Sequence, residues 1–388
     1  MSSQGLKVAA VSGSRADWSL LLPVLSAIRE HPKLQLLLWV TGSHLEKRFG
    51  NTVQTIRETG FDIHAEVPLN LQTGSDLDTS QALAHAITGF AKTIEQQQPD
   101  LLLVLGDRYE IFGAVQAAAL AKVPIAHIAG GDISEGAYDD AMRHAISKLS
   151  HLHFATNSPA RERLVQMGEQ PNQVILSGSP GIDAILATDL LTPEQLGGQI
   201  DFEFQATNLA VSFHPATLDT ASPADQVAEL LGALERIDPA IGLVFTGSNA
   251  DTGGDVVNNA MRDFAADRPN SCFVQSLGSL RYFSLVSAVD LLVGNSSSGL
   301  YEAPSLNTPT LDIGIRQQGR LRGDSVKHVD NKAADIAAAI SLLLDQPCHH
   351  FENPYGDGSA AQRIVNAIAA IEDPKSLLQK RFYRVRAR

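Results

Sequence analysis

Acidic and basic side chains gather after two apolar runs in the first half of the chain. The run Leu101–Leu105 ends at Gly106, Asp107 and Arg108. The next run, Pro124–Ile128, leads into a polar loop and a helical pattern that carry Asp132, Glu135, Asp139, Asp140, Arg143 and His144. Clustered carboxylates can share acid and base roles, because repulsion and burial separate their pKa values. Any one of these carboxylates can also be a helix N-cap or a surface charge. Five carboxylates and two arginines on two adjacent loops are more than capping and solubility explain, so the set favours a functional site.

A third apolar run, Lys7–Val11, passes through the small polar turn Ser12–Asp17 into a helical pattern. This order of strand, small-residue turn and helix is typical of phosphate-binding units. The full G-x-G-x-x-G fingerprint is absent, so the turn does not favour a dinucleotide site. Arg15 can reach an anionic ligand from the turn, or it can be a solvated turn residue. The C-terminal ends of parallel strands form the ligand crevice of an open sheet, so we expect these turns to meet there.

Small polar residues follow an apolar run in the second half as well. The segment Gly294–Gly299 contains Ser296, Ser297 and Ser298, and Glu302 lies just beyond it in a helical pattern. Backbone N–H groups and serine hydroxyls at such a helix start, Gly299 included, can bind a diphosphate. A nearby carboxylate can accept hydrogen bonds from both ribose hydroxyls. The alternatives are a flexible turn and a glutamate favoured by the helix dipole.

A histidine and an arginine group complete the polar residues of the second half. His214 follows the run Leu209–Phe213 and precedes Pro215, which cannot continue a strand ladder. It can hydrogen-bond a leaving phosphate, although a lone histidine is more often structural. The arginines that follow the last apolar run can neutralise phosphates or be solvated, and they are Arg316, Arg320 and Arg322.

The order of elements predicts two α/β domains. Strand and helix patterns alternate through the first half, and the rhythm breaks over residues 188–208 before it restarts. Such alternation indicates parallel sheets with helices on both faces. We expect an N-terminal Rossmann-like domain over residues 1–182, with C-terminal helices from about 360–388 packing back on it, and a C-terminal Rossmann-like domain over residues 183–359. Two such domains with parallel sheets facing a central cleft form the GT-B architecture of nucleotide-sugar enzymes.

Composition narrows the classes of function. The chain has 388 residues, a net charge of −13 and only two cysteines. The negative charge argues against nucleic-acid binding but not against a small anionic ligand held by local arginines. We find no apolar stretch of membrane-spanning length and no His/Cys cluster with the spacing of a metal site. We therefore expect a cytoplasmic protein without a metal, a cofactor or a membrane partner.

Taken together, these motifs make residues 6–370 resemble the UDP-N-acetylglucosamine 2-epimerases, and within them the hydrolysing branch. The segments that carry the resemblance, in chain order, are Ser14–Asp17, Gly106–Arg108, His127–Asp132, Asp139–His144, Phe213–Pro215, Gly294–Gly299 with Glu302, and Gly314–Gln317. The resemblance implies the GT-B fold, a UDP-sugar substrate and a homodimer or homotetramer. It also implies a reaction in which a base removes the proton at C2 while UDP leaves from C1, giving a 2-acetamidoglucal to which water adds. The product is a free N-acetylmannosamine-type sugar, a precursor of sialic acids.

The resemblance also assigns residues. Asp107, Asp139 and Arg143 match catalytic positions. The positions that match substrate or UDP contacts are Arg15, Ser19, Arg108, His214, Asn249, Ser296, Ser297, Glu302 and Arg316. With the neighbouring residues already described, we expect Asp132, Glu135 and His214 to join the catalytic set, and Ser298 and Gly299 to join the nucleotide site.

One departure concerns the substrate. Many family members have a glutamate where this chain has Ala129, and the chain has an additional residue between Gly131 and Asp139. The catalytic role of the missing carboxylate would then pass to Asp132 or Glu135. The departure also suggests a modified substrate, such as UDP-N,N′-diacetylbacillosamine or a GDP-linked donor. Loss of the carboxylate can also mean lost activity. The remaining alternatives are a non-hydrolysing 2-epimerase, a GT-B glycosyltransferase and a non-catalytic nucleotide-sugar binding protein.

Overall fold

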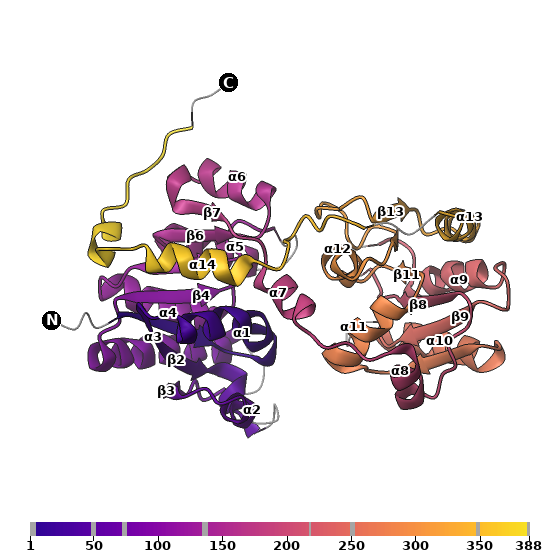
Figure 1. Cartoon of the computed structure of the whole chain (residues 1–388), viewed down its shortest axis with the longest axis horizontal. Coiled ribbons are helices and arrows are strands. Elements are labelled where there is room, and N and C mark those ends of the chain that lie inside the picture. The colour runs from indigo at the N-terminus through magenta and orange to yellow at the C-terminus, as the bar shows by residue number, and fades with distance from the viewer. Residues whose placement is uncertain are drawn as a thin grey trace. The chain divides into compact units, whose positions relative to one another are not determined.

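The chain forms two compact units, each built on one sheet. A computed structural model describes residues 5–47, 52–71, 76–133, 139–216, 219–248, 253–346 and 350–385. Unit 1 comprises Met1–Ala184 and Tyr355–Arg388, and unit 2 comprises Ile185–Pro354. Helices lie on both faces of each sheet (Figure 1). Among the described helices, none combines the length and apolar character that crossing a membrane requires.

Unit 1 contains a sheet of seven parallel strands. Its strands are β1 (Leu6–Ser12), β2 (Leu34–Thr41), β3 (Ile63–Val67), β4 (Leu101–Leu105), β5 (Ile125–Ile128), β6 (Leu152–Ala155) and β7 (Val174–Leu176), in the spatial order β3-β2-β1-β4-β5-β6-β7. Its helices are α1 (Arg15–Glu30), η1 (Gly42–Leu45), α2 (Val53–Glu58), α3 (Asp76–Gln97), α4 (Tyr109–Leu120), α5 (Asp139–Leu149), α6 (Ser158–Gln166), η3 (Pro171–Gln173), α14 (Ala360–Ala369) and η5 (Pro374–Leu378). Helix α7 (Pro180–Leu186) spans the boundary with unit 2.

Unit 2 repeats this plan with six parallel strands. They are β8 (Asn208–Ser212), β9 (Gly242–Thr246), β10 (Ser271–Val274), β11 (Leu291–Gly294), β12 (Thr310–Ile313) and β13 (Val326–Val329), in the order β10-β9-β8-β11-β12-β13. The helices are α8 (Pro193–Ile200), α9 (Pro223–Leu234), α10 (Gly254–Asp267), α11 (Gly278–Ala288), α12 (Ser298–Tyr301), η4 (Ala303–Leu306) and α13 (Ala333–Leu344). The two sheets confirm the predicted α/β class with two Rossmann-like halves.

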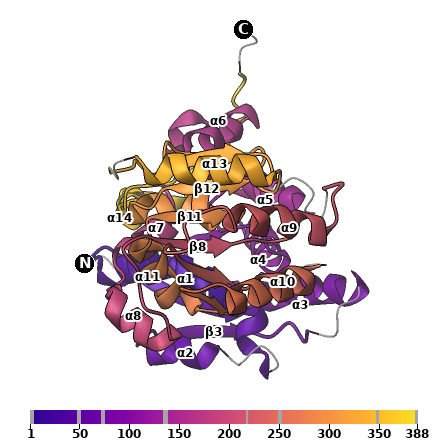
Figure 2. The same ribbon diagram turned by 90° about the vertical axis from the view of Figure 1, so that its right-hand side faces the viewer.

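Continuous apolar strands are buried on both faces, because successive side chains point to opposite sides of a sheet. In β1, Val8 and Ala10 join the core under α1 and α14, whereas Ala9 and Val11 join the core under α3 and α4. In unit 2, α9, α10 and α13 cover one face, which Figure 2 shows toward the viewer. Helices α8, α11 and η4 contribute apolar side chains to the core on the opposite face.

In both sheets, the order in which strands are added reverses between the first and the fourth strand. In unit 1, strands β1 to β3 extend to one side and strands from β4 onward extend to the other, so β1 pairs with β4. In unit 2, β8 pairs with β11 in the same way. Loops at such a switch point diverge to opposite faces and leave a crevice beyond the strand ends. Predicted site motifs follow β1, β4, β8 and β11, and others follow the adjacent strands β5 and β12.

Several local features differ from the sequence pattern. The edge strands β3 and β13 were not predicted, because their alternating or exposed side chains lack a continuous apolar run. Helix α6 is capped by Asn157, whose side chain accepts from the Ala160 N–H. Helix α12 is only four residues long, so Glu302 lies at its C-terminal end and not within it.

The C-terminal segment returns to unit 1 and is held there by a buried carboxylate. Helix α14, yellow in Figure 1, packs beside α1. Beyond it, Lys380 Nζ lies 2.6 Å from Glu169 Oε2, and Lys148 and His153 contact the same carboxylate. Burial alone would raise the pKa of Glu169, but the hydrogen bonds from His153, Lys148 and Lys380 outweigh it and lower the pKa to about 2. Lys380 also donates to the carbonyls of Lys148 and Ser150.

We expect Lys380→Ala to lower the free energy of unfolding of unit 1 by about 1–3 kcal/mol, because Glu169 would keep its charge but lose a partner. Both tryptophans, Trp18 and Trp39, lie in unit 1, so tryptophan fluorescence during urea denaturation reports on this unit alone. Lys375→Ala, which removes an exposed lysine from the same segment, should change the midpoint little. Equal midpoints for the two variants would contradict the anchoring role of Lys380.

Candidate functional site

The turn after β4 is fixed by a neutral histidine from β5. Gly106 has φ +78°, a left-handed conformation that glycine adopts readily. His127 Nε2 donates to the Gly106 carbonyl at 2.8 Å, and the ring is fully buried. Burial lowers the pKa of His127 to about 3, so the ring stays neutral and keeps this hydrogen bond at physiological pH. This role could not be predicted, since His127 occupies one position of a short apolar strand.

Asp107 and Arg143 form an ion pair at the end of β4. The Arg143 guanidinium donates to the Asp107 carboxylate. It also donates to the Asp132 carbonyl at 3.0 Å and lies 3.4 Å from Asp140 Oδ1. The Arg143 side chain is 9% exposed and that of Asp107 20%. Asp107 from the first loop and Asp132 and Asp140 from the second thus meet around one largely buried arginine.

Asp139 and Asp132 lie in different environments beside this pair. Asp139 begins α5, and burial followed by repulsion from Asp107 raises its pKa, against the attraction of Arg108 and Arg143. Burial also raises the pKa of Asp132, although both of its oxygens accept hydrogen bonds, from Thr156 Oγ1 and Asn157 Nδ2 at 2.9 Å each. Both carboxylate oxygens of Asp132 are therefore engaged by side chains that follow β6.

The loop after β5 begins with an unusual backbone. Ala129 has φ +63°, and Gly131 has φ +81°. The first value is uncommon for a residue with a side chain and costs free energy that the surrounding structure must offset. Ala129 N–H donates to the Phe154 carbonyl, which holds it against β6. Gly131 leaves no room for a side chain, since a Cβ there would lie 2.4 Å from the Ala160 carbonyl oxygen.

The remaining predicted residues of unit 1 are more exposed. Arg15 and Ser19 occupy the exposed first turns of α1, where Ser19 Oγ donates to the Arg15 carbonyl. Arg108 precedes α4, and its Nε donates to Glu110 Oε1 at 2.5 Å. Glu135 lies outside the described residues.

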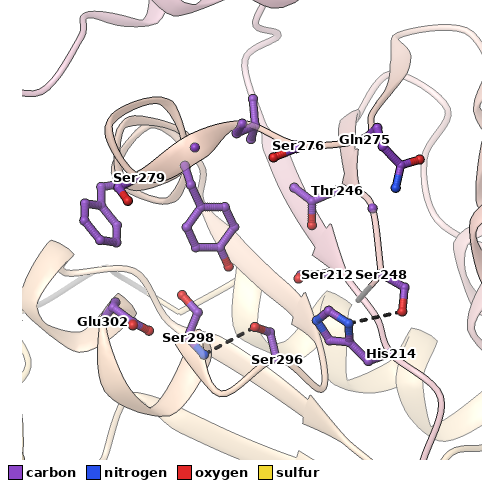
Figure 3. Close-up of a pocket in the computed structure, with 15 residues that line it drawn as sticks. Ser212, His214, Thr246, Ser248, Gln275, Ser276, Ser279, Ser296, Ser298 and Glu302 are labelled. Atoms are coloured by element: carbon purple, nitrogen blue, oxygen red, sulfur yellow. Dashed lines mark hydrogen bonds between the residues drawn. The ribbon is translucent and has the colours of Figure 1, made fainter. Parts of the chain in front are cut away.

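Unit 2 contains a pocket of about 560 Å³ at the ends of its central strands. It brings together four predicted residues, His214, Ser296, Ser298 and Glu302. Figure 3 shows Ser296 between Ser298 and His214, with Glu302 on the far side of Ser298. Pocket residues that the sequence analysis missed include Ser212, Thr246, Ser248, Gln275, Ser276, Tyr282 and Phe283. A volume of this size is typical of small-molecule sites.

Three buried polar atoms in this pocket are poorly satisfied. Within the described ranges, Glu302 Oε2, Tyr282 Oη and Ser298 Oγ are buried without a hydrogen bond of good geometry, and the polar groups closest to them are one another and pocket serines such as Ser296. Burial raises the pKa of both Glu302 and Tyr282. Since unpaired buried polar groups are costly, such a set indicates a site that a polar ligand completes.

His214 is clamped by an asparagine from the neighbouring strand end. Its backbone N–H donates to Asn295 Oδ1, and Asn295 Nδ2 donates to the His214 carbonyl, both at 2.8 Å. The His214 ring lies 3.2 Å from Ser248 Oγ through Nδ1. Arg316 Nη1 donates to the Asn295 carbonyl at 3.1 Å, which links the loop after β12 to the same point.

The other predicted residues surround this pocket. Ser297 precedes α12 as its N-cap, and Gly299 allows α12 to approach β12, since a Cβ there would lie 2.4 Å from Thr310 Cγ2. Asn249 lies outside the described residues. Strand-end position is the signal that could have identified Ser212, Thr246 and Ser248, whereas Tyr282 lies within an ordinary helical pattern and offers none.

Comparison with known proteins places these features in a family. A family model described as UDP-N-acetylglucosamine 2-epimerase matches residues 26–369. Polysialic acid biosynthesis protein P7 of Escherichia coli is 35% identical over 375 residues, covering 95% of this chain and 94% of that protein. A hydrolysing UDP-N,N′-diacetylbacillosamine 2-epimerase of Legionella pneumophila is 31% identical over 374 residues, covering 96% and 98% of the two chains.

A solved structure extends the comparison to the fold. The crystal structure of UDP-GlcNAc 2-epimerase from Neisseria meningitidis bound to UDP-GlcNAc matches with a TM-score of 0.76 at 22% identity, and the match covers 94% of this chain and 99% of that chain. This likeness confirms the predicted GT-B type of fold. Since the family model spans most of the chain and both relatives exceed 30% identity along nearly its whole length, the protein belongs to the UDP-N-acetylglucosamine 2-epimerase family.

Proposed function

We propose that the protein is a hydrolysing 2-epimerase that converts a UDP-linked 2-acetamido sugar into UDP and the free 2-epimer. The observation that carries the proposal is the arrangement at the β4 and β5 ends, where Asp139 lies near the Asp107–Arg143 ion pair. Family membership and the hydrolysing relative support the same class of reaction. The substrate is UDP-N-acetylglucosamine or its 4-acetamido-6-deoxy analogue, UDP-N,N′-diacetylbacillosamine.

In the first step, Asp139 removes the proton at C2 as the bond between C1 and the UDP oxygen breaks. The electrons of the C2–H bond form the C1–C2 double bond of a 2-acetamidoglucal, and UDP departs with the electrons of its bond to C1. A raised pKa makes the ionised Asp139 carboxylate a stronger base than an ordinary aspartate. Arg143 fixes Asp107 beside it, and Asp132 braces the loop through Thr156 and Asn157.

In the second step, water adds across the double bond. Its hydroxyl joins C1 and a proton joins C2 on the face opposite to that of the lost proton, which gives the free epimer. We assign this second proton transfer to Asp107, which takes up the proton that the adding water loses and delivers it to C2, while Asp139 releases the proton from the first step to solvent. In unit 2, the Glu302 carboxylate accepts from the ribose hydroxyls, and the serine segment with His214 and Arg316 binds the diphosphate.

Incubation of the donor alone in deuterated water tests the proposed reaction. We expect free sugar with deuterium at C2 together with UDP, detected by NMR and ion-pair chromatography. UDP- and GDP-linked forms of both sugars would be compared, with the nucleotides measured separately. A nucleotide-linked epimer that persists would identify a non-hydrolysing enzyme. Release of the nucleotide only when an acceptor is added would identify a glycosyltransferase. A donor that stays intact after long incubation would identify a binding protein.

We expect Asp139→Asn and Asp107→Asn each to lower kcat by about a hundredfold or more, which corresponds to ~2.7 kcal/mol of transition-state stabilisation. The amides cannot carry out the proton transfers, but UDP affinity should persist, because the carboxylates act on the sugar. Asp100→Asn is a matched control at the opposite end of β4, where Asp100 accepts from the Lys7 N–H. Turnover at the wild-type rate in either amide variant would reject its assigned role.

We expect Glu302→Gln to weaken UDP binding by about ten- to a hundredfold, as loss of hydrogen bonds to a charged group would do. Burial raises the pKa of Glu302, so the charged carboxylate is costly to bury, and a neutral amide in its place should leave the free protein at least as stable. Titration calorimetry with UDP and thermal unfolding without ligand measure the two effects. Glu229→Gln, which changes a unit 2 carboxylate bound to the Ala333 N–H, serves as the control. Unchanged UDP affinity in Glu302→Gln would contradict the ribose assignment.

A further inference from the structure

Glu110 carries a buried carboxylate that the proposed reaction does not use. It lies in the first turn of α4, and its residue is 0% exposed. One oxygen, Oε1, accepts from Arg108 Nε at 2.5 Å. The other, Oε2, is buried without a hydrogen-bond partner in the described parts of the chain. Burying a carboxylate is costly unless a cation compensates it, so the position calls for an explanation.

Two glycines from other strand ends make room for this carboxylate. A Cβ at Gly13, in the loop after β1, would lie 2.7 Å from Glu110 Oε1. A Cβ at Gly42, which follows β2 with φ +59°, would lie 3.2 Å from the same oxygen. The loops after β1, β2 and β4 thus converge on Glu110, and any side chain at Gly13 would displace its carboxylate.

The adjacent residues Asp107 and Arg108 form ion pairs with different partners. Asp107 pairs with Arg143, whereas Arg108 pairs with Glu110. Asp17 of α1 is a second acidic group that interacts with Arg108. Burial raises the pKa of Asp17 to about 6, with Arg108 lowering it and Glu110 raising it. The Arg108 side chain remains 44% exposed, and its bond to Glu110 uses Nε, the nitrogen nearest the chain.

We propose that Glu110 is a positioning residue, which holds Arg108 by Nε so that the terminal guanidinium nitrogens can bind the anionic part of the substrate. The inference rests on the proposed function, since it requires a substrate that carries phosphate. An arginine held at Nε keeps its planar donors in a fixed orientation, so less entropy is lost when an anion binds.

A double-mutant cycle tests whether Glu110 acts through Arg108. We expect Arg108→Ala to raise KM for the nucleotide sugar about tenfold or more, with a much smaller change in kcat, as loss of uniform binding predicts. Glu110→Gln should raise KM in the same way but less. In the double variant, KM should equal that of Arg108→Ala alone, because Glu110 has nothing left to position.

Gly13→Ala displaces the Glu110 carboxylate by steric contact and leaves the charge of Glu110 unchanged. It should raise KM in the wild-type background and have no further effect in the Arg108→Ala background, which preserves the test if Glu110→Gln does not fold. Asp183→Asn is the control for a buried carboxylate in unit 1, since Asp183 accepts from the N–H groups of Ala360 and Ala361. It should lower the unfolding midpoint and leave KM unchanged.

KM effects that multiply in the double variants would overturn the proposal, and so would a Glu110→Gln enzyme with lower stability but wild-type KM. If the wild-type protein cleaves no donor, the proposed function fails instead. The same cycle is then measured with dissociation constants for UDP-N-acetylglucosamine by calorimetry, where non-additivity supports the role of Glu110 and additivity rejects it.

Discussion

The parallel pairing of β1 with β4, and of β8 with β11, is the constraint on which the rest of the structure depends. Each pairing places two strand ends side by side and sends the following loops to opposite faces of the sheet. Three groups of contacts lie at these two points: the Asp107–Arg143 ion pair, the buried Glu110 carboxylate with Arg108, and the hydrogen bonds between Asn295 and His214. The helices and outer strands bury the apolar faces that keep these central strands in register.

Much of this arrangement could be predicted, because the central strands are buried on both faces. Such strands are short continuous apolar runs, and polar residues directly after them stand out, as at Asp107, His214 and Ser296. Strands β3 and β13 could not be predicted, since their alternating or exposed side chains form no continuous apolar run.

Residues whose role depends on distant loops could not be predicted. Glu110 reads as an ordinary acidic residue in the first turn of a helix, and its burial follows from space left by Gly13 and Gly42. Tyr282 reads as an apolar residue of α11, although its hydroxyl is buried in the pocket of unit 2. Position within an element is visible in a sequence, whereas the cavity that a side chain enters is a property of several segments together.

The division of the chain has a consequence for biosynthesis. Unit 2 is one continuous segment, but unit 1 is completed by residues from Tyr355 onward. Its core under α1 includes Ile364, Val365 and Ile368 of α14. During translation, residues 1–184 are therefore synthesised before α14, and the apolar face that α14 covers stays exposed until the C-terminal segment has been made. A ribosome that stalls or terminates early leaves that face open to chaperones and to aggregation.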